Sequence, residues 1–176
     1  MQTGTYRNGG FLLTQVRNII VLLIVLTMLF MSSGQTYEQQ SLVPELEKWL
    51  PGKPLESLLA MLEIPYWGIK VSIAERGYYE FVEFLIRKSA HFFTFSLIAI
   101  MIYAVLPKWR FRKVVAAFLT LLVAIADEVH QSLTAGRTAS SQDVMLDMAG
   151  AVTILILLHF STIVKHSKTK KSAKGL

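Results

Sequence analysis

Four long apolar runs, separated by shorter polar segments, dominate the sequence. They cover residues 18–34, 84–106, 112–134 and 143–164, and the first of them contains no charged residue. About 20 helical residues rise roughly 30 Å, which is the thickness of the hydrocarbon core of a bilayer. The pattern therefore predicts one all-α domain over residues 1–176, a polytopic membrane protein with four transmembrane helices.

The first apolar run also fits a second interpretation. A basic start followed by an apolar stretch is typical of a cleaved signal peptide. Cleavage needs small residues at fixed positions before the cut, and Met31 stands at one of these positions, beside Ser32 and Ser33. We therefore predict an uncleaved transmembrane helix, with a signal peptide as the alternative.

The segment 35–83 differs from the apolar runs, because it holds most of the acids and prolines of the chain. Ser41 can cap a short helix with Pro44 in its first turn. Leucines between 55 and 62 follow the spacing of one helix face, and residues 68–73 alternate weakly, as in a short strand. We predict an extracellular segment with short helices at the membrane interface. A lid over a substrate site is the alternative.

The basic residues predict how the chain crosses the membrane. The amino end carries +2, the 107–113 loop +4 and the tail at 165–176 +5, whereas the 34–88 segment carries −2 and the stretch 127–147 carries −3. Positively charged loops stay in the cytoplasm. Four spans with both termini in the cytoplasm satisfy this distribution. The lysine-rich tail is expected to be disordered.

Charge and composition also exclude other classes of protein. The placement of the basic residues in the predicted cytoplasmic segments accounts for the net charge of +6, and the sequence contains no nucleic-acid-binding motif. We therefore expect no nucleic-acid partner. Basic loops instead favour contact with anionic membrane lipids. The absence of cysteine excludes a disulfide framework and a thiolate metal site. No cofactor is expected, and the oligomeric state stays open.

Polar residues gather at the outer ends of the second, third and fourth runs and in the turn between the last two. The set is Lys88, His91, Asp127, Glu128, Gln131, Arg137, Asp143 and Asp147. Within each run its members include pairs three or four residues apart, which share one face of a helix. Asp127 lies 14 residues beyond Lys113, about 21 Å along a helix, so its carboxylate must face the bundle interior. Because ionisable groups at this depth are costly, a functional role is the first hypothesis.

Three motifs around these residues resemble those of the VanZ-like family of small bacterial membrane proteins. They read RKSAHFFTF, DEVHQ and GRTASSQDVMLDMAGA, and the resemblance covers roughly Phe81 to Val164. It implies a four-span bundle in the bacterial cytoplasmic membrane and a link to low-level teicoplanin resistance. It also implies that the polar set and Gly150 are shared with the family. The chain departs from the family at Phe95, where many members have Tyr, and at Asp147, where some have Asn.

Recognition of an envelope component is the leading functional hypothesis. Lys88 and Arg137 can hold a phosphate or a carboxylate, Arg137 through two parallel hydrogen bonds. Gln131, Asp143 and Asp147 can orient these cations or bind amines and hydroxyls. This ligand-binding chemistry fits a membrane lipid, a lipid-linked cell-wall precursor or a glycopeptide. With the resemblance, it suggests an effect on susceptibility to teicoplanin.

Two other interpretations stay open. As an intramembrane enzyme, the protein would use His91 as a general acid or base beside the catalytic carboxylates of Asp127 and Glu128, with or without a metal. Their side chains are of the kind that divalent metals accept, but no local ligand spacing identifies a metal. As a purely structural feature, ion pairs of Lys88 or Arg137 with Asp127 or Asp143 would hold the helices together, although apolar residues would do this equally well.

Overall fold

A computed structural model describes residues 5–66, 68–134 and 139–174 of the chain. Within these ranges, four helices are long and apolar enough to cross a membrane. They are α1 (Thr5–Ser33), α5 (Tyr78–Val105), α6 (Arg112–Ser132) and α7 (Ser141–Lys174). The prediction of an all-α polytopic membrane protein with four spanning helices is confirmed.

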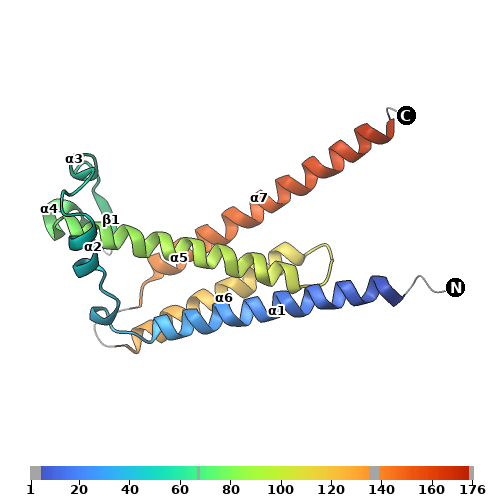
Figure 1. The fold of residues 1–176 in the computed structure, drawn as a ribbon, viewed down its shortest axis with the longest axis horizontal. Coiled ribbons are helices and arrows are strands. Elements are labelled where there is room, and N and C mark those ends of the chain that lie inside the picture. Colours follow the sequence, from blue (N-terminus) through green and yellow to red (C-terminus); the bar gives the residue numbers. More distant parts are fainter. Residues whose placement is uncertain (1–4, 67, 135–138, 175–176) are drawn as a thin grey trace.

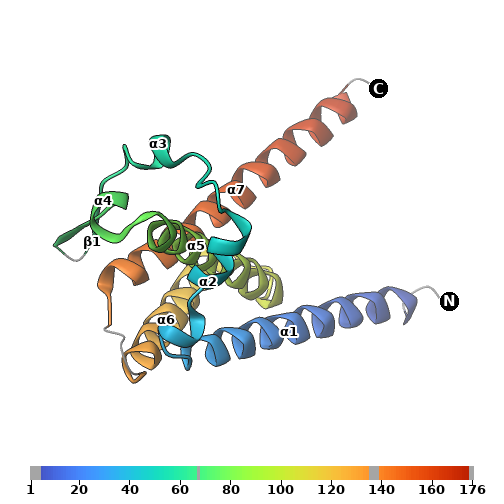
Figure 2. The same ribbon diagram turned by 60° about the vertical axis from the view of Figure 1, so that its left-hand side comes forward.

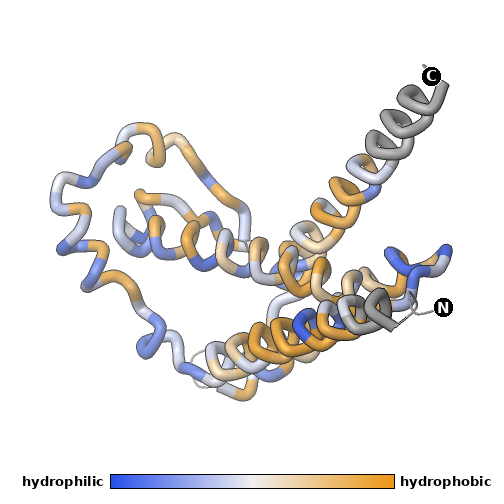
Figure 3. The backbone as a smooth tube through the Cα atoms, turned by 45° about the vertical axis from the view of Figure 1, so that its right-hand side comes forward, coloured by the Kyte–Doolittle hydropathy of each residue, from blue (hydrophilic) through white to orange (hydrophobic). Residues whose placement is uncertain are grey.

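The helices alternate in direction, so the polar connections gather at two opposite ends. Figure 1 shows the start of α1 and the end of α7 at one end of the bundle, with the short elements between α1 and α5 at the other. The turned view in Figure 2 shows α7 crossing the bundle, with its later half diverging from the other helices. Hydrophobic positions run along the lengths of the helices in Figure 3, as expected of surfaces that face lipid.

The helix ends follow from local chain chemistry. Gly77 adopts φ +84° between α4 and α5, a conformation that glycine tolerates and that begins the long helix cleanly. α5 ends at Val105, and Leu106 is extended because the residue before Pro107 avoids helical backbone. Both breaks permit the sharp changes of chain direction on either side of α5.

Short elements fill the segment between α1 and α5. They are η1 (Glu38–Gln40), α2 (Val43–Trp49), α3 (Glu56–Leu59), β1 (Ile64–Tyr66), β2 (Ile69–Val71) and α4 (Ile73–Arg76). The two strands form an antiparallel hairpin in which Tyr66 pairs with Ile69, and Gly68 at φ +72° lies in its turn. The hairpin extends the short strand expected from the alternation, and its turn fixes the place of Tyr66.

A buried carboxylate ties this segment to α5. Glu83, whose side chain is only 1% exposed, accepts a hydrogen bond from the Leu42 amide at 2.9 Å and pairs with Arg87 at 2.6 Å. Ser41 does not cap α2 as expected, because its hydroxyl lies 3.4 Å from Glu83 while α2 begins one residue later, after Leu42. Glu83 thus contacts the two residues directly before the first residue of α2.

The two terminal helices are longer than the apolar runs from which they were predicted. α1 begins at Thr5 rather than near residue 18, and α7 continues to Lys174 through the tail that was expected to be disordered. No glycine or proline interrupts the sequence from Ala151 to Lys174. Lysine and alanine are good helix formers, so a helix already built in the bundle can propagate through them.

Small residues let α5 and α7 approach each other closely. A side chain added at Gly150 would place its Cβ 2.2 Å from the backbone oxygen of Phe92 and 3.0 Å from Ser96 Oγ. The neighbouring core contains Ala99 and Ala151, both without solvent exposure, and Phe95 packs beside them. Small residues at a helix contact are the usual way in which membrane helices achieve close approach.

The side chains that contact each other between α5 and α7 are paired with a nearly constant offset in residue number. Lys88 pairs with Asp143 and His91 faces Asp147, which gives offsets of 55 residues (143 − 88) and 56 residues (147 − 91). A nearly constant difference means that α5 and α7 run in the same direction. The second and fourth spans of an alternating four-helix bundle must run this way.

Replacing Gly150 with alanine is expected to separate α5 from α7. In an exposed helix position this change stabilises by about 1 kcal/mol, but here the new methyl group meets backbone that cannot turn away. We expect Gly150→Ala to lower the free energy of unfolding by about 1–3 kcal/mol, measured by thermal unfolding in detergent. Gly10→Ala is the matched control, because no atom lies within 4 Å of its added Cβ. Equal stability of the two variants would contradict the close contact.

Candidate functional site

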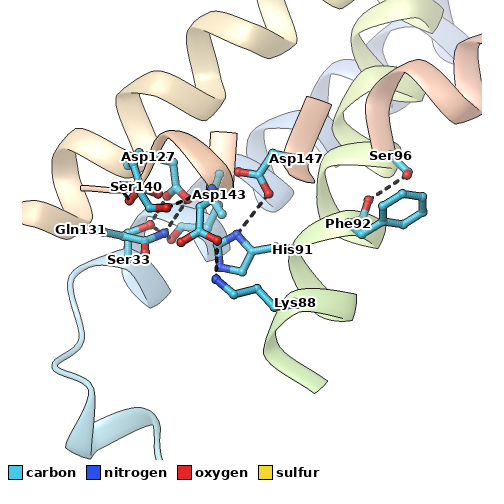
Figure 4. Close-up of polar contacts among 12 residues, drawn as sticks. Ser33, Lys88, His91, Phe92, Ser96, Asp127, Gln131, Ser140, Asp143 and Asp147 are labelled. Atoms are coloured by element: carbon cyan, nitrogen blue, oxygen red, sulfur yellow. Dashed lines mark hydrogen bonds and ion pairs between the residues drawn. The ribbon is translucent and has the colours of Figure 1, made fainter. Parts of the chain in front are cut away.

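The polar residues of the spanning helices form two adjacent layers near the segment between α1 and α5 (Figure 4). In the outer layer, Lys88 Nζ on α5 pairs with Asp143 Oδ1 on α7 and donates to the Tyr66 hydroxyl at 2.7 Å. Tyr66 in turn donates to Asp143 Oδ1. The side chains of Lys88 and Asp143 are 23% and 17% exposed, so this triad lies at the boundary between the bundle and its surroundings.

Tyr66, the last residue of β1 in the hairpin, completes the outer layer. Burial raises the pKa of its phenol above the ordinary value of 10.0, and the hydrogen bond to Asp143 raises that pKa further. The ring also lies beneath the ammonium of Lys88, with Nζ 4.4 Å from the ring centroid. Tyr66 therefore holds the cation through its ring and its hydroxyl, and it remains a neutral hydrogen-bond donor over the physiological range of pH.

The inner layer lies one turn further along the helices. His91 Nδ1 on α5 faces Asp147 Oδ1 on α7 at 3.3 Å, and the Asp147 side chain is 1% exposed. Potential ligand atoms of His91, Asp127 and Asp147 all lie within 4.8 Å of one another. An imidazole and two carboxylates thus meet inside the bundle.

Asp127 is held in this layer by two other helices. The Ser33 hydroxyl at the end of α1 is hydrogen-bonded to Asp127 Oδ1, and Gln131 Nε2, one turn along α6, donates to Oδ2 at 2.8 Å. The Asp127 side chain is buried. α1, α5, α6 and α7 therefore each contribute a polar side chain to the inner layer or to its immediate support. Ser33 is the residue through which α1 contacts this layer.

Glu128 has a separate position and partner. Its carboxylate accepts a hydrogen bond from the backbone amide of Ser140, the residue that precedes α7. The Ser140 hydroxyl then accepts from the Asp143 amide at 3.2 Å, as an N-cap does. Glu128 thereby fixes where α7 begins, and with it the position of Asp143.

A cavity of about 440 Å³ opens beside the outer layer. Its wall includes Tyr66, Arg76, Arg87, Lys88, His91, Gln131 and Asp143. Three of these side chains are cationic and one is an acid, so the cavity carries an excess of positive charge. His91 and Gln131 belong both to this wall and to the inner layer or its support, so the cavity adjoins the buried cluster.

The structure brings together most, but not all, of the residues predicted for the site. Lys88 and Asp143 share the outer layer, and His91, Asp127 and Asp147 share the inner one, supported by Gln131. Glu128 was expected to act with Asp127 but instead holds the Ser140 amide. Arg137 lies outside the described residues.

Several residues of the site were not predicted to belong to it. Tyr66 and Arg76 were given no role in the site, and Ser33 was considered only beside a possible cleavage position. They reach the site through the folding of the connecting segment and the packing of α1. The sequence contains one signal, position, since Ser33 and Asp127 both lie near the outer ends of their apolar runs, the first and the third.

Fold and site together define a class: a four-helix membrane protein with a layered cluster of ionisable side chains beside a cationic cavity. The family profile described as VanZ/LLP1 matches residues 18–163, and the chain belongs to that family. The expected VanZ-like membership is thus confirmed. No curated protein and no solved structure matches the chain.

Replacing Tyr66 with phenylalanine is expected to change the pH dependence of stability. The folded protein holds the phenolic proton more tightly than the unfolded chain, so its contribution to stability is complete below the ordinary pKa of 10.0 and is lost as pH rises beyond it. We expect the melting temperature of Tyr66→Phe to fall less steeply than that of the wild type between about pH 9 and 11. If the melting temperatures of the two proteins fall in parallel with pH, the pKa of Tyr66 is not raised in the folded state.

Proposed function

We propose that the protein binds the anionic headgroup of a membrane lipid or a lipid-linked cell-wall precursor in the cavity beside Lys88. The observation that carries this proposal is the excess of cationic side chains on the cavity wall. Phosphate groups are recognised by such clusters of arginine and lysine. A cavity at the end of a membrane-spanning bundle is accessible to a headgroup whose acyl chains stay in the bilayer.

The three cationic side chains of the cavity wall differ in how many of their hydrogen-bond donors are already engaged within the protein. Arg87 already binds Glu83 and donates to Gln40 Oε1 at 2.9 Å, so it mainly supports the wall. Lys88 has three donor hydrogens and uses two of them on Tyr66 and Asp143. Arg76 contacts the ring of Phe84 at 5.9 Å and pairs with no carboxylate in the described part of the chain. Arg76 is therefore the cation best able to take a new anionic partner.

The proposed setting is the bacterial cytoplasmic membrane, with both termini in the cytoplasm and the cavity facing outward. The distribution of basic residues supports this orientation, because the amino end, the loop after α5 and the end of α7 together hold 11 of the 18 lysines and arginines and no acid. In this setting the protein would meet envelope lipids and glycopeptide antibiotics on the outer side of the membrane. A changed supply or exposure of lipid-linked precursor is the proposed route to altered susceptibility to teicoplanin.

Acid–base catalysis on the bound ligand is a second candidate function. His91 favours it, because this imidazole lines the cavity and lies 3.3 Å from the buried carboxylate of Asp147. Glu128 is less suited to catalysis than expected, since it holds a backbone amide. Recovery of every bound lipid unchanged after incubation with the wild-type protein, followed by mass spectrometry, would contradict this candidate.

Neutralising Arg76 is expected to weaken lipid binding. We expect Arg76→Gln to bind phosphatidylglycerol or a polyprenyl phosphate roughly tenfold more weakly than the wild type, because one charge-assisted contact is lost. Native mass spectrometry of the purified full chain, titrated with each lipid and with phosphatidylcholine as the neutral reference, measures this change. Competition by inorganic phosphate distinguishes recognition of the phosphate from recognition of the whole lipid.

The matched control is Arg110→Gln. Arg110 also lies over a phenylalanine ring, that of Phe111 at 5.4 Å, but in the loop between α5 and α6 and away from the cavity. Retained binding in Arg110→Gln and weakened binding in Arg76→Gln would support the proposal. Equal affinity of Arg76→Gln and the wild type, or equal affinity for the anionic and neutral lipids, would overturn it.

A further inference from the structure

Two buried polar atoms face each other in the inner layer without forming a hydrogen bond. His91 Nδ1 and Asp147 Oδ1 are 3.3 Å apart, within ion-pair distance (Figure 4), yet their orientation makes no hydrogen bond and neither atom has another hydrogen-bond partner in the described part of the chain. A buried carboxylate oxygen left in this state costs free energy, and native structures usually give such an atom a partner. The Asp147 side chain is 1% exposed, so bulk water does not supply that partner.

The geometry of these atoms fits joint coordination of a metal ion. Zinc binds imidazole nitrogen and carboxylate oxygen at about 2.0–2.2 Å, so two ligands of a tetrahedral zinc lie roughly 3.3 Å apart. The separation of His91 Nδ1 and Asp147 Oδ1 has this value. A ligand oxygen of Asp127 completes the set within 4.8 Å. A shift of roughly 1 to 1.5 Å would bring that oxygen to the same centre.

The negative charge of the two buried carboxylates also favours a bound cation. Asp127 and Asp147 are both buried, and two carboxylates at this distance repel each other at low dielectric. The nearest lysine of the site, Lys88, is engaged one layer away by Asp143 and Tyr66. A divalent cation would balance both carboxylates while His91 stays neutral, which is the form in which imidazole binds metals.

An ion pair between a charged His91 and Asp147 is the competing arrangement. A charged imidazole donates from both ring nitrogens and would direct the Nδ1 hydrogen at the carboxylate. The observed orientation does not make that hydrogen bond, although the two atoms are within reach of it. A separation of 3.3 Å is longer than the roughly 2.7–2.9 Å of a charge-assisted hydrogen bond and is that of two ligands around a shared ion.

We propose that His91, Asp127 and Asp147 bind a divalent transition metal, with zinc the best match to one imidazole and two carboxylates. Ser33 and Gln131 orient Asp127, as outer hydrogen bonds orient metal ligands elsewhere. Three protein ligands leave a position open for water or for an oxygen of a bound molecule. Because His91 also lines the cavity, the metal site adjoins the cavity. The metal site stands apart from the proposed lipid binding and can be tested without lipid.

Metal binding by the full chain tests this proposal. The protein is purified through an affinity tag free of histidine, treated with a chelator, and titrated with zinc alone in detergent without added lipid. We expect one zinc per chain, and we expect Asp147→Asn and His91→Gln each to weaken it by at least roughly 100-fold. X-ray absorption at the zinc edge should show one imidazole in the wild type and its loss in His91→Gln.

Asp143→Asn is the matched control, because it removes a carboxylate one turn away on the same helix while leaving the three ligands in place. It should bind zinc as the wild type does. Thermal unfolding identifies variants that fold, and the two independent ligand changes keep the test decisive if one of them fails to fold. Absence of bound zinc in the wild type, or equal loss in Asp143→Asn and Asp147→Asn, would overturn the proposal.

Discussion

Gly150 lies where α7 comes so close to α5 that any side chain would overlap the backbone of Phe92. This contact sets the register of two parallel helices, and the polar layers depend on that register. One turn before Gly150 on α7 lies Asp147, which meets His91, and one further turn back lies Asp143, which meets Lys88. A rotation or a slide of either helix would separate both pairs at once.

The same register determines how buried charge is accommodated. In a bilayer, an ionisable side chain must find its partners inside the protein, because lipid offers none. In the outer layer, Lys88 has Asp143 and the Tyr66 hydroxyl, so each charge there is compensated. In the inner layer, Asp127 has hydrogen bonds from Ser33 and Gln131, but His91 is the one side chain of the described chain that forms an ion pair with either buried carboxylate. A purely structural clamp accounts well for the first layer and poorly for the second.

Periodicity and charge are sufficient to predict the four spans, their alternation and the level at which the polar residues lie. They do not predict which polar side chains contact one another. Helix spacing places Asp127 and Glu128 next to each other, but the rotation of α6 directs Asp127 to the inner layer and Glu128 to the Ser140 amide. Tyr66 reaches Lys88 through a hairpin, whose packing on the bundle is a tertiary effect that a local pattern does not contain.

Two differences between expectation and structure have local causes. Ser41 has the sequence of a helix cap, but the buried carboxylate of Glu83 binds this stretch and the helix starts later. The lysine-rich end of α7 has the composition of a disordered tail, yet a preformed helix extends through it to Lys174. In both places the neighbouring structure changed the outcome that the local sequence favours.

Cross-linking in membranes tests the central claim, that the register of α5 and α7 brings His91 and Asp147 together. The chain has no cysteine, so pairs can be introduced without background. With His91→Cys and Asp147→Cys combined, a short bifunctional thiol reagent should link the two positions efficiently. With Phe93→Cys and Asp147→Cys combined it should not, because Phe93 is 68% exposed on the outer surface of α5. Equal cross-linking of the two pairs, or cross-linking of the Phe93 pair alone, would contradict the account.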